Sequence, residues 1–137
     1  MSDYDYLLRK FRREPGASEE QIRQASEELG LELPADYMAF MRQCDGGSGI
    51  IGAHYVVLWG VEGLAEENRE YEADINTPEL LLIADDGGGE FFAFDKRITP
   101  WPVVMVSMIG MNLDPYIFKA PTFDAFLRLP EEDEDSE

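Results

Sequence analysis

The clearest structural signal in this chain is a pair of apolar runs joined by an acidic, glycine-rich loop: Leu80-Leu81-Leu82-Ile83-Ala84-Asp85-Asp86-Gly87-Gly88-Gly89-Glu90-Phe91-Phe92-Ala93-Phe94-Asp95. Each run has the length of a strand, and the second is rich in aromatic residues, which favour strands. The glycines between the runs permit positive φ, as a tight hairpin requires. We therefore predict two antiparallel strands, Leu80 to Ala84 and Phe91 to Phe94, with the acidic loop at their tip.

Further strands are predicted on both sides of this hairpin, because β-branched and aromatic residues again occur in short runs. The runs are Ile50-Ile51, Tyr55 to Trp59, Trp101 to Ser107 and Tyr116 to Phe118. Between the second run and the hairpin, Gly63 to about Glu72 is polar with few apolar anchors. We expect that segment to form an exposed helix.

The N-terminal segment predicts a short helix from Ser2 or Asp3 to about Arg13. Its apolar residues recur at the i, i+3, i+4 and i+7 positions of one helical face: Tyr4, Leu7, Leu8 and Phe11. Four of the eleven basic residues fall in its last turns: Arg9, Lys10, Arg12 and Arg13. Cations there would favour the negative end of the helix dipole. Pro15-Gly16 then ends the element.

Two more helices precede the strands. The first opens with a capping box formed by Ser18 and Gln21 and ends at Gly30, a suitable left-handed residue. The second opens at Pro34, which suits a first helical position, and is stopped by the segment Asp45 to Gly49. Their expected buried faces are Ile22, Ala25 and Leu29 on one helix and Tyr37, Phe40, Met41 and Cys44 on the other.

Near the end of the chain, Thr122 is placed to cap a short helix that Pro130 would close. The order of elements is therefore helices, a series of hairpin-linked strands, and a final helix. This order is typical of an α+β domain, and it predicts an antiparallel sheet covered on one face. At 137 residues the chain has the length of one domain, which we assign to residues 1–130. The tail, Glu131 to Glu137, is acidic apart from Ser136 and is predicted to be disordered.

Charge limits the classes of partner. The chain has 29 acidic and 11 basic residues and a net charge of -18. Such a field repels nucleic acid and anionic membranes and accelerates the encounter with basic proteins. The simpler interpretation is that the charge only keeps the protein soluble. The sequence has no apolar run of membrane length, no secretory signal and a single cysteine, which together indicate a cytoplasmic protein.

Catalytic and metal-binding patterns are scarce. His54 is the only histidine, which excludes a zinc site of several histidines. A nucleophilic pair of Cys44 and His54 is conceivable, but Cys44 lies on the apolar helical face, where a thiol packs well. The carboxylates of Asp85, Asp86 and Glu90 could hold Ca²⁺ or Mg²⁺, although acidic hairpin tips are common as solvated turns. We therefore expect no enzyme activity, no cofactor and no metal; an undetected carboxylate enzyme is the alternative.

Three segments of the sequence carry a resemblance to a known family. They are Ser18-Glu19-Glu20-Gln21-Ile22 through Leu31-Glu32-Leu33-Pro34-Ala35-Asp36-Tyr37 to Cys44-Asp45-Gly46-Gly47, the hairpin from Leu82 to Asp95, and Phe123-Asp124-Ala125-Phe126-Leu127. In this order and spacing they resemble the SUKH superfamily, a family of bacterial immunity proteins that also includes the yeast cell-wall assembly regulator. The hairpin with its Gly-Gly-Glu is the most specific segment. The basic first helix and the acidic tail have no counterpart in the resemblance.

The resemblance implies a single α+β domain with a central, mostly antiparallel sheet flanked by helices. It also implies a non-catalytic protein that binds a cognate toxin, in many relatives a nuclease. With the net charge, this favours an immunity protein whose partner is a basic toxin domain. Candidate contact residues are Asp85, Asp86 and Glu90, with Trp59 as an aromatic anchor. The alternative is an intracellular interaction scaffold or regulator with no toxin partner, since fold does not dictate function.

Overall fold

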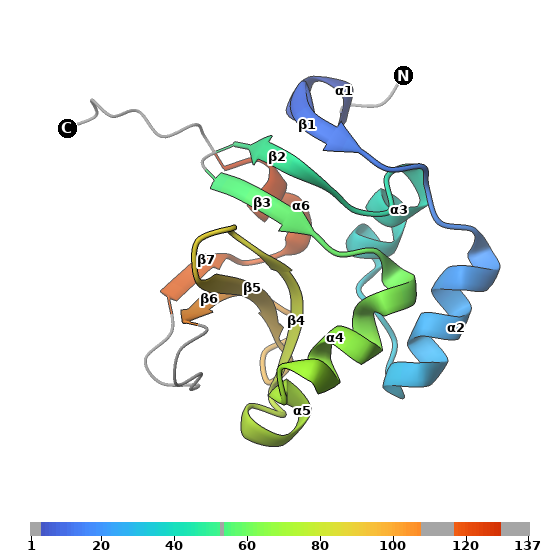
Figure 1. The fold of residues 1–137 in the computed structure, drawn as a ribbon, viewed down its shortest axis with the longest axis vertical. Coiled ribbons are helices and arrows are strands. Elements are labelled where there is room, and N and C mark those ends of the chain that lie inside the picture. Colours follow the sequence, from blue (N-terminus) through green and yellow to red (C-terminus); the bar gives the residue numbers. More distant parts are fainter. Residues whose placement is uncertain (1–3, 53, 108–116, 130–137) are drawn as a thin grey trace.

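The computed structural model describes residues 4–52, 54–107 and 117–129 (Figure 1). In these residues a seven-stranded antiparallel sheet forms, and each strand pairs with the next along the chain. The strands are β1 Lys10–Arg13, β2 Gly47–Ile51, β3 His54–Leu58, β4 Leu80–Asp85, β5 Glu90–Asp95, β6 Val103–Ser107 and β7 Ile117–Ala120. The helices are α1 Tyr4–Leu7, α2 Glu19–Leu29, α3 Ala35–Gln43, the 3-10 turn η1 Val61–Gly63, α4 Leu64–Glu70, α5 Ala73–Asn76 and α6 Phe123–Leu127. The predicted α+β class is confirmed.

The predicted hairpin is β4 and β5, and both faces of these strands are buried. Alternate residues of a strand point to opposite faces. On β5, Phe92 and Phe94 therefore join the large core cluster, on what we call the inner face, while Phe91 and Ala93 join a second cluster on the outer face. The prediction that the sheet is covered on one face is wrong at its centre, because α4 and α5 pack on β4.

Helices α2 and α3 were predicted from local signals, and the structure confirms these signals. The Ser18 hydroxyl accepts from the Gln21 N–H at 3.1 Å, and the Ser18 N–H donates to the Gln21 side chain at 2.8 Å. Pro34 proves to be the N-cap of α3 rather than its first residue, a shift of one position. The four residues of the expected α3 face are fully buried in the inner cluster: Tyr37, Phe40, Met41 and Cys44. The closing helix α6 begins after Thr122, whose hydroxyl accepts from the Ala125 N–H at 3.1 Å.

Tyr37 carries a hydroxyl without a hydrogen-bond partner in the described residues, although its ring packs edge-on against Phe94 and Phe123. Burial, with a smaller effect from Asp45, raises the pKa of this phenol. A buried polar group that lacks a partner costs stability. We expect Tyr37→Phe to keep the ring contacts and to raise the free energy of unfolding by about 1 kcal/mol. Urea unfolding checks this value; a loss of stability would mean that the hydroxyl is paired.

The N-terminal segment is not a single helix, so that prediction is wrong beyond Leu7. Helix α1 ends there, and residues Lys10–Arg13 form the edge strand β1. Phe11 points inward and is 7% exposed, while Lys10 and Arg12 point outward, which is the alternation of a strand. The apolar residues identified from the sequence do face the core. Of the basic cluster, Lys10, Arg12 and Arg13 lie on the edge strand and Arg9 lies in the turn before it.

The glycine-rich segment after α3 was predicted only to stop that helix, but most of it is strand β2. Gly47 and Gly49 have φ of 141° and 143°, values that side chains rarely allow. A Cβ on Gly49 would lie 2.4 Å from the Lys10 carbonyl oxygen. These glycines let β1 approach β2 closely enough to pair along its whole length.

Helix α4 is not the exposed element that its composition predicted. Leu64, Ala65 and Asn68 are buried, and the Asn68 amide bonds to the backbone of Leu82 in β4. The short helix α5 that follows was not predicted. Ala73 of α5 joins the outer cluster, whereas α4 lies beside β4 and contributes Leu64 to the inner cluster.

Asp45 is held at the end of α3, where its Oδ1 accepts from the Val61 N–H at 2.8 Å. Burial raises the pKa of this carboxyl, the hydrogen bond lowers it, and the charges of Glu62 and Glu14 raise it further, for a net rise above 3.8. The folded state therefore binds the proton more tightly than the unfolded state, and this contribution to stability is lost as pH rises through the folded pKa.

Asp45→Asn keeps an acceptor for Val61 and removes the charge. We expect the variant to melt at a higher temperature than the unchanged chain at pH 7. The difference should shrink toward zero as pH falls below about 3.8, where the carboxyl is neutral in both states. Thermal melts at the two pH values measure this directly. A constant difference would contradict the role of the charge.

The assigned tail, residues 131–137, and the predicted contributions of Tyr116 and Pro130 lie outside the described residues. No helix in the described ranges is both long and apolar enough to cross a membrane.

Candidate functional site

The four residues singled out from the sequence lie together at the β4–β5 hairpin. The Trp59 indole Nε1 donates to Asp85 Oδ2 at 3.1 Å. Across the hairpin, the Asp86 N–H donates to the Glu90 carbonyl at 3.1 Å. Each of the four side chains is half-buried, so each keeps some surface for contact with another molecule.

The loop carboxylates also shape the loop. Asp85 Oδ1 accepts from the Gly87 N–H at 2.8 Å, and Asp86 Oδ1 accepts from the N–H groups of Gly88 at 2.7 Å and Glu90 at 3.1 Å. Aspartate commonly stabilises a turn in this way. The carboxylate of Glu90, in contrast, makes no hydrogen bond or ion pair to the described residues. Asp85 and Asp86 are thus held in fixed positions, whereas the Glu90 carboxylate has no partner among the described residues.

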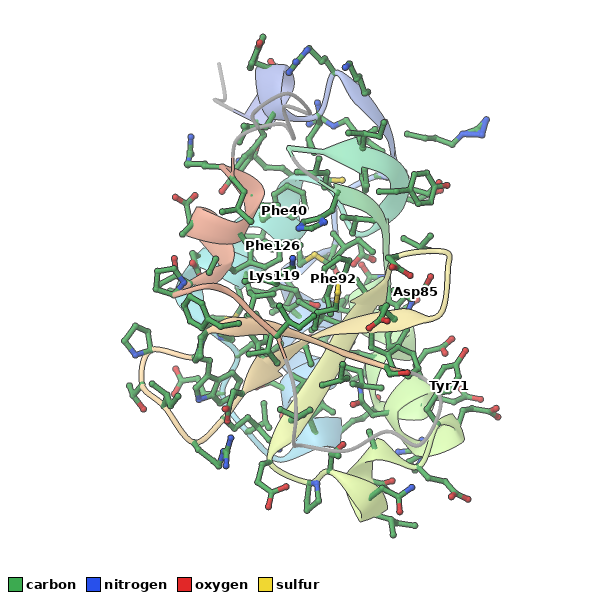
Figure 2. The ribbon with its side chains drawn as sticks, turned by 90° about the vertical axis from the view of Figure 1, so that its left-hand side faces the viewer. Phe40, Tyr71, Asp85, Phe92, Lys119 and Phe126 are labelled. Carbon is green, nitrogen blue, oxygen red and sulfur yellow. The ribbon has the colours of Figure 1, made fainter. Side chains whose placement is uncertain are left out.

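Trp59 belongs to an aromatic cluster that the sequence did not indicate. Its ring stacks on Tyr71 at 6.1 Å between centroids and meets Phe91 edge-on at 5.9 Å. Tyr71, at the end of α4, is 43% exposed. Figure 2 shows Tyr71 and Asp85 on the same side of the molecule, away from the interior group of Phe40, Phe92 and Phe126. The only signal for Tyr71 was an aromatic residue in a highly charged segment.

The outer face of β2 and β3 lies next to the hairpin loop and the aromatic cluster. Tyr55 and Ile50 pair across the two strands and are 49% and 41% exposed. The Tyr55 ring also reaches the hairpin, since a Cβ on Gly87 would lie 3.2 Å from it. Sequence reasoning assigned both residues to strands but could not tell which face would stay open.

We call the whole region the hairpin surface and define it by the three loop carboxylates and the aromatic and aliphatic residues beside them: Asp85, Asp86, Glu90, Trp59, Tyr71, Tyr55 and Ile50. Aromatic residues are enriched in the cores of protein-binding surfaces, and polar and charged residues lie at their rims.

The residues considered for nucleophilic catalysis have other neighbours. Cys44 is fully buried, and its thiol donates to the Gly46 carbonyl at 3.2 Å. Burial raises the pKa of this thiol, which disfavours the reactive thiolate. The His54 ring stacks on Phe126 at 6.1 Å and lies 5.4 Å from Phe92. Both side chains pack in the inner cluster or against it.

The hairpin carboxylates were also considered as ligands for Ca²⁺ or Mg²⁺. Within the described ranges, no three His, Cys, Asp or Glu side chains are grouped as a metal site would require. The oxygens of Asp85 and Asp86 instead accept the backbone and indole hydrogen bonds given above.

Comparison with known proteins gives a match that covers the chain from α2 to α6 and leaves out α1 and β1. Among curated proteins, no significant match is found. A family model described as the SMI1 / KNR4 family (SUKH-1) matches residues 16–129, which contain the matched helices, the hairpin and the closing helix described above. The chain belongs to the SMI1 / KNR4 family (SUKH-1).

Proposed function

We propose that this protein is an immunity protein that neutralises a cognate toxin by direct binding, without catalysis. The SUKH family includes immunity proteins and cell-wall regulators. The observation that carries the proposal is the hairpin surface, where fixed carboxylates stand beside partly exposed aromatic rings. We place the protein in the cytoplasm, where a single buried thiol such as Cys44 stays reduced.

Charge supports a basic partner. The net charge of -18 would draw a basic toxin domain toward the protein and would repel nucleic acid and anionic membranes. The carboxylates of Asp86 and Glu90 would then meet lysine or arginine side chains at contact distance. A nuclease toxin fits this chemistry, because its own active site must attract phosphates.

The aromatic residues supply the apolar part of the surface. Tyr71 covers one face of Trp59, and Asp85 fixes the orientation of the indole through its hydrogen bond. Rings that are already fixed lose little conformational freedom on binding. The hairpin surface therefore combines charges that speed association with anchors that slow dissociation.

The structure restricts the variants that test these charges. Reversing Asp85 or Asp86 would break the loop bonds, so a loss of binding would not isolate charge. Asp86→Asn keeps the Oδ1 acceptor, and Glu90→Gln changes a carboxylate with no partner in the described residues. The matched control is Glu28→Gln with Glu66→Gln on α2 and α4, two exposed residues away from the hairpin.

The experiment begins with capture of partners from the source cell's lysate on the immobilised chain, followed by mass spectrometry. A captured basic protein is then purified, and its affinity is measured for three chains. They are the unchanged chain, the hairpin variant that combines Asp86→Asn with Glu90→Gln, and the control variant that combines Glu28→Gln with Glu66→Gln. We expect the hairpin variant to bind about tenfold more weakly, roughly 1.4 kcal/mol, and the control variant to bind within about twofold of the unchanged chain. The toxin's activity should fall when the unchanged chain is added.

Other outcomes are informative. Equal weakening by both double variants would mean that overall charge, and not the hairpin surface, drives binding. Capture of regulatory or structural proteins, or of none above background, would favour the interaction scaffold. A captured basic protein whose activity is unchanged by binding would also contradict the immunity proposal.

A further inference from the structure

The end of the sheet opposite the hairpin loop carries a pocket of about 500 Å³. Strand β5 begins at the hairpin loop and ends at Asp95, and its length separates the two places by about 20 Å. The pocket lies between the start of α3, the β5–β6 loop and the N-cap of α6. We call it the Trp101 pocket, and its lining includes Glu32, Pro34, Asp36, Pro100, Trp101 and Thr122.

The wall of the Trp101 pocket is apolar. Two prolines, Pro34 and Pro100, line it together with the tryptophan ring. This ring lies 5.7 Å from the ring of Phe94, between centroids, and packs against the inner cluster. It is only partly buried, so it keeps a surface that faces the pocket. A ring that is already held in place loses little conformational freedom on binding.

The β5–β6 loop, residues 96–102, is held by the fully buried carboxylate of Asp95. Its Oδ1 accepts from the N–H and from Nε of Arg97, each at 3.0 Å, and its Oδ2 accepts from Nη2 at 2.9 Å. The Asp95 N–H donates to the Pro102 carbonyl at 3.1 Å, and the Lys96 N–H donates to the Glu79 carbonyl at 2.8 Å. This side of the pocket is therefore preformed, as ligand-binding sites usually are.

The charged groups of the pocket are acidic. Among the described residues that line it, Glu32 and Asp36 carry charge and none is basic. The exposed Glu32 carboxylate makes no hydrogen bond or ion pair within the part of the chain that the structure describes. Asp36 has a structural role, because its Oδ2 accepts from the Asp124 N–H at 2.9 Å. Its Oδ1 is not used by that bond. Two carboxylates beside an apolar wall are complementary to a cation on an apolar stem.

We propose that the Trp101 pocket binds an arginine side chain of a partner protein. The methylene stem would lie against the prolines and the Trp101 ring, and the guanidinium would pair with Glu32 and Asp36. Arginine stacks on aromatic rings and pairs with carboxylates through its planar group. It is also enriched in protein interfaces, where lysine is depleted. The net charge of -18 would attract the basic segment that carries it.

This inference does not depend on the proposed function, since a toxin and a scaffold partner could each supply the arginine. It adds a second contact site, at the other end of the sheet from the hairpin surface. The two sites can be tested separately, because each contains one of the two tryptophans of the chain, Trp59 and Trp101.

Nuclear magnetic resonance titration of the full chain tests the proposal with the blocked peptide acetyl-Gly-Arg-Gly-amide as the probe. The salt concentration is about 0.15 M, where the Debye length of about 8 Å screens attraction to the overall negative charge. One comparison peptide has citrulline, which keeps the shape of arginine and lacks its charge. The other has norleucine, which keeps the apolar stem alone. The indole N–H signals of Trp101 and Trp59 report the pocket and the hairpin surface.

The pocket variant combines Glu32→Gln with Asp36→Asn, which keeps an acceptor for the Asp124 N–H. The matched control combines Glu28→Gln with Glu66→Gln, which removes the same charge from exposed positions of α2 and α4. Equal unfolding midpoints show that each chain is folded. If the pocket variant is unstable, Glu32→Gln alone takes its place, because that carboxylate has no partner to lose among the described residues.

We expect the arginine peptide to shift the Trp101 indole signal saturably, together with the amide signals of the β5–β6 loop. Binding should be about tenfold weaker for either comparison peptide and for the pocket variant, and within about twofold of the unchanged chain for the control. No shift, or equal shifts at both tryptophans, would overturn the proposal. Equal affinity for the norleucine peptide would overturn it in favour of an apolar occupant. Trp101 signals that move when the chain alone is diluted would overturn it in favour of a second copy of the chain.

Discussion

Replacing Asn68 by alanine is expected to lower the free energy of unfolding by about 3–4 kcal/mol, since three buried hydrogen bonds would be lost. The Asn68 Nδ2 donates to the carbonyls of Leu64 at 2.9 Å and Leu82 at 3.0 Å, and its Oδ1 accepts from the Leu82 N–H at 2.9 Å. Leu82 is fully buried, so alanine would leave its N–H and C=O without partners. A typical domain is stable by only 5–15 kcal/mol, which makes this a large fraction of the total.

Asn68 is needed because the pairing of β3 with β4 ends before Leu82. Strand β3 pairs with β4 only at Val57–Asp85 and Leu58–Ala84, and the last bond on that side runs from the Trp59 N–H to the Ile83 carbonyl at 3.1 Å. The next backbone groups, those of Leu82, face the space that β3 has left. Toward Leu82 the Asn68 amide presents one N–H donor and one carbonyl acceptor, as a peptide group does, so it takes the place of a strand residue there, while its second N–H donates to Leu64.

Urea unfolding followed by circular dichroism measures the effect. Asn68→Asp should also be destabilised, because a carboxylate can accept from Leu82 but cannot donate to it. Asn76→Ala, at an exposed position of α5, is the matched control and should change stability by no more than about 0.5 kcal/mol. A loss below about 1 kcal/mol for Asn68→Ala would mean that water or a shifted backbone satisfies Leu82.

The elements that could be predicted from the sequence depend on neighbours along the chain. The capping box of α2 lies within four residues, and the Thr122 cap of α6 bonds to Ala125. The β4–β5 hairpin is similarly local, because its loop bonds from Asp85 and Asp86 reach no further than Glu90. These hydrogen bonds could be predicted because both partners are close in the sequence and do not depend on distant parts of the chain.

Strand β1 could not be predicted in this way. The spacing of Tyr4, Leu7, Leu8 and Phe11 fits a helix, and the alternation from Lys10 to Arg13 is too short to oppose it. The decisive feature is distant, since β1 exists by pairing with β2, where Phe11 lies opposite Gly49. The buried face of α4 could not be predicted from its polar composition either. Asn68 is buried because it bonds to the backbone of Leu82, which is 14 residues away in the sequence.

The candidate site shows the same limit. The acidic loop was visible as a set of charges, and Trp59 as an isolated aromatic residue. Their contact joins residues 26 positions apart, and the stacking of Tyr71 on Trp59 depends on where α4 ends. The types of residue could be read from the sequence, whereas their grouping into one surface required the fold.

Gly16→Ala is the second substitution with a large expected effect, about 3 kcal/mol of lost stability from overpacking. A Cβ at this position would lie 1.9 Å from the Arg42 carbonyl oxygen and 2.6 Å from its carbon. Both atoms belong to the backbone of α3, so a change of side-chain rotamer cannot relieve the clash. The segment is also held on both sides, by the Ala17 N–H donating to the Met41 carbonyl at 2.8 Å and the Asp45 N–H donating to the Pro15 carbonyl at 3.1 Å.

A methyl group would force this segment away from α3 and weaken both hydrogen bonds at once. The cost should appear as a lower urea midpoint of unfolding with an unchanged m-value, the slope of the unfolding free energy against urea concentration. Gly63→Ala is the control, because its backbone has φ of -95° and no atom lies within 4 Å of the added Cβ. That variant should be neutral or more stable by up to about 1 kcal/mol. If both variants behaved alike, the close approach at Gly16 would not be what requires a glycine there, and general backbone freedom would explain it instead.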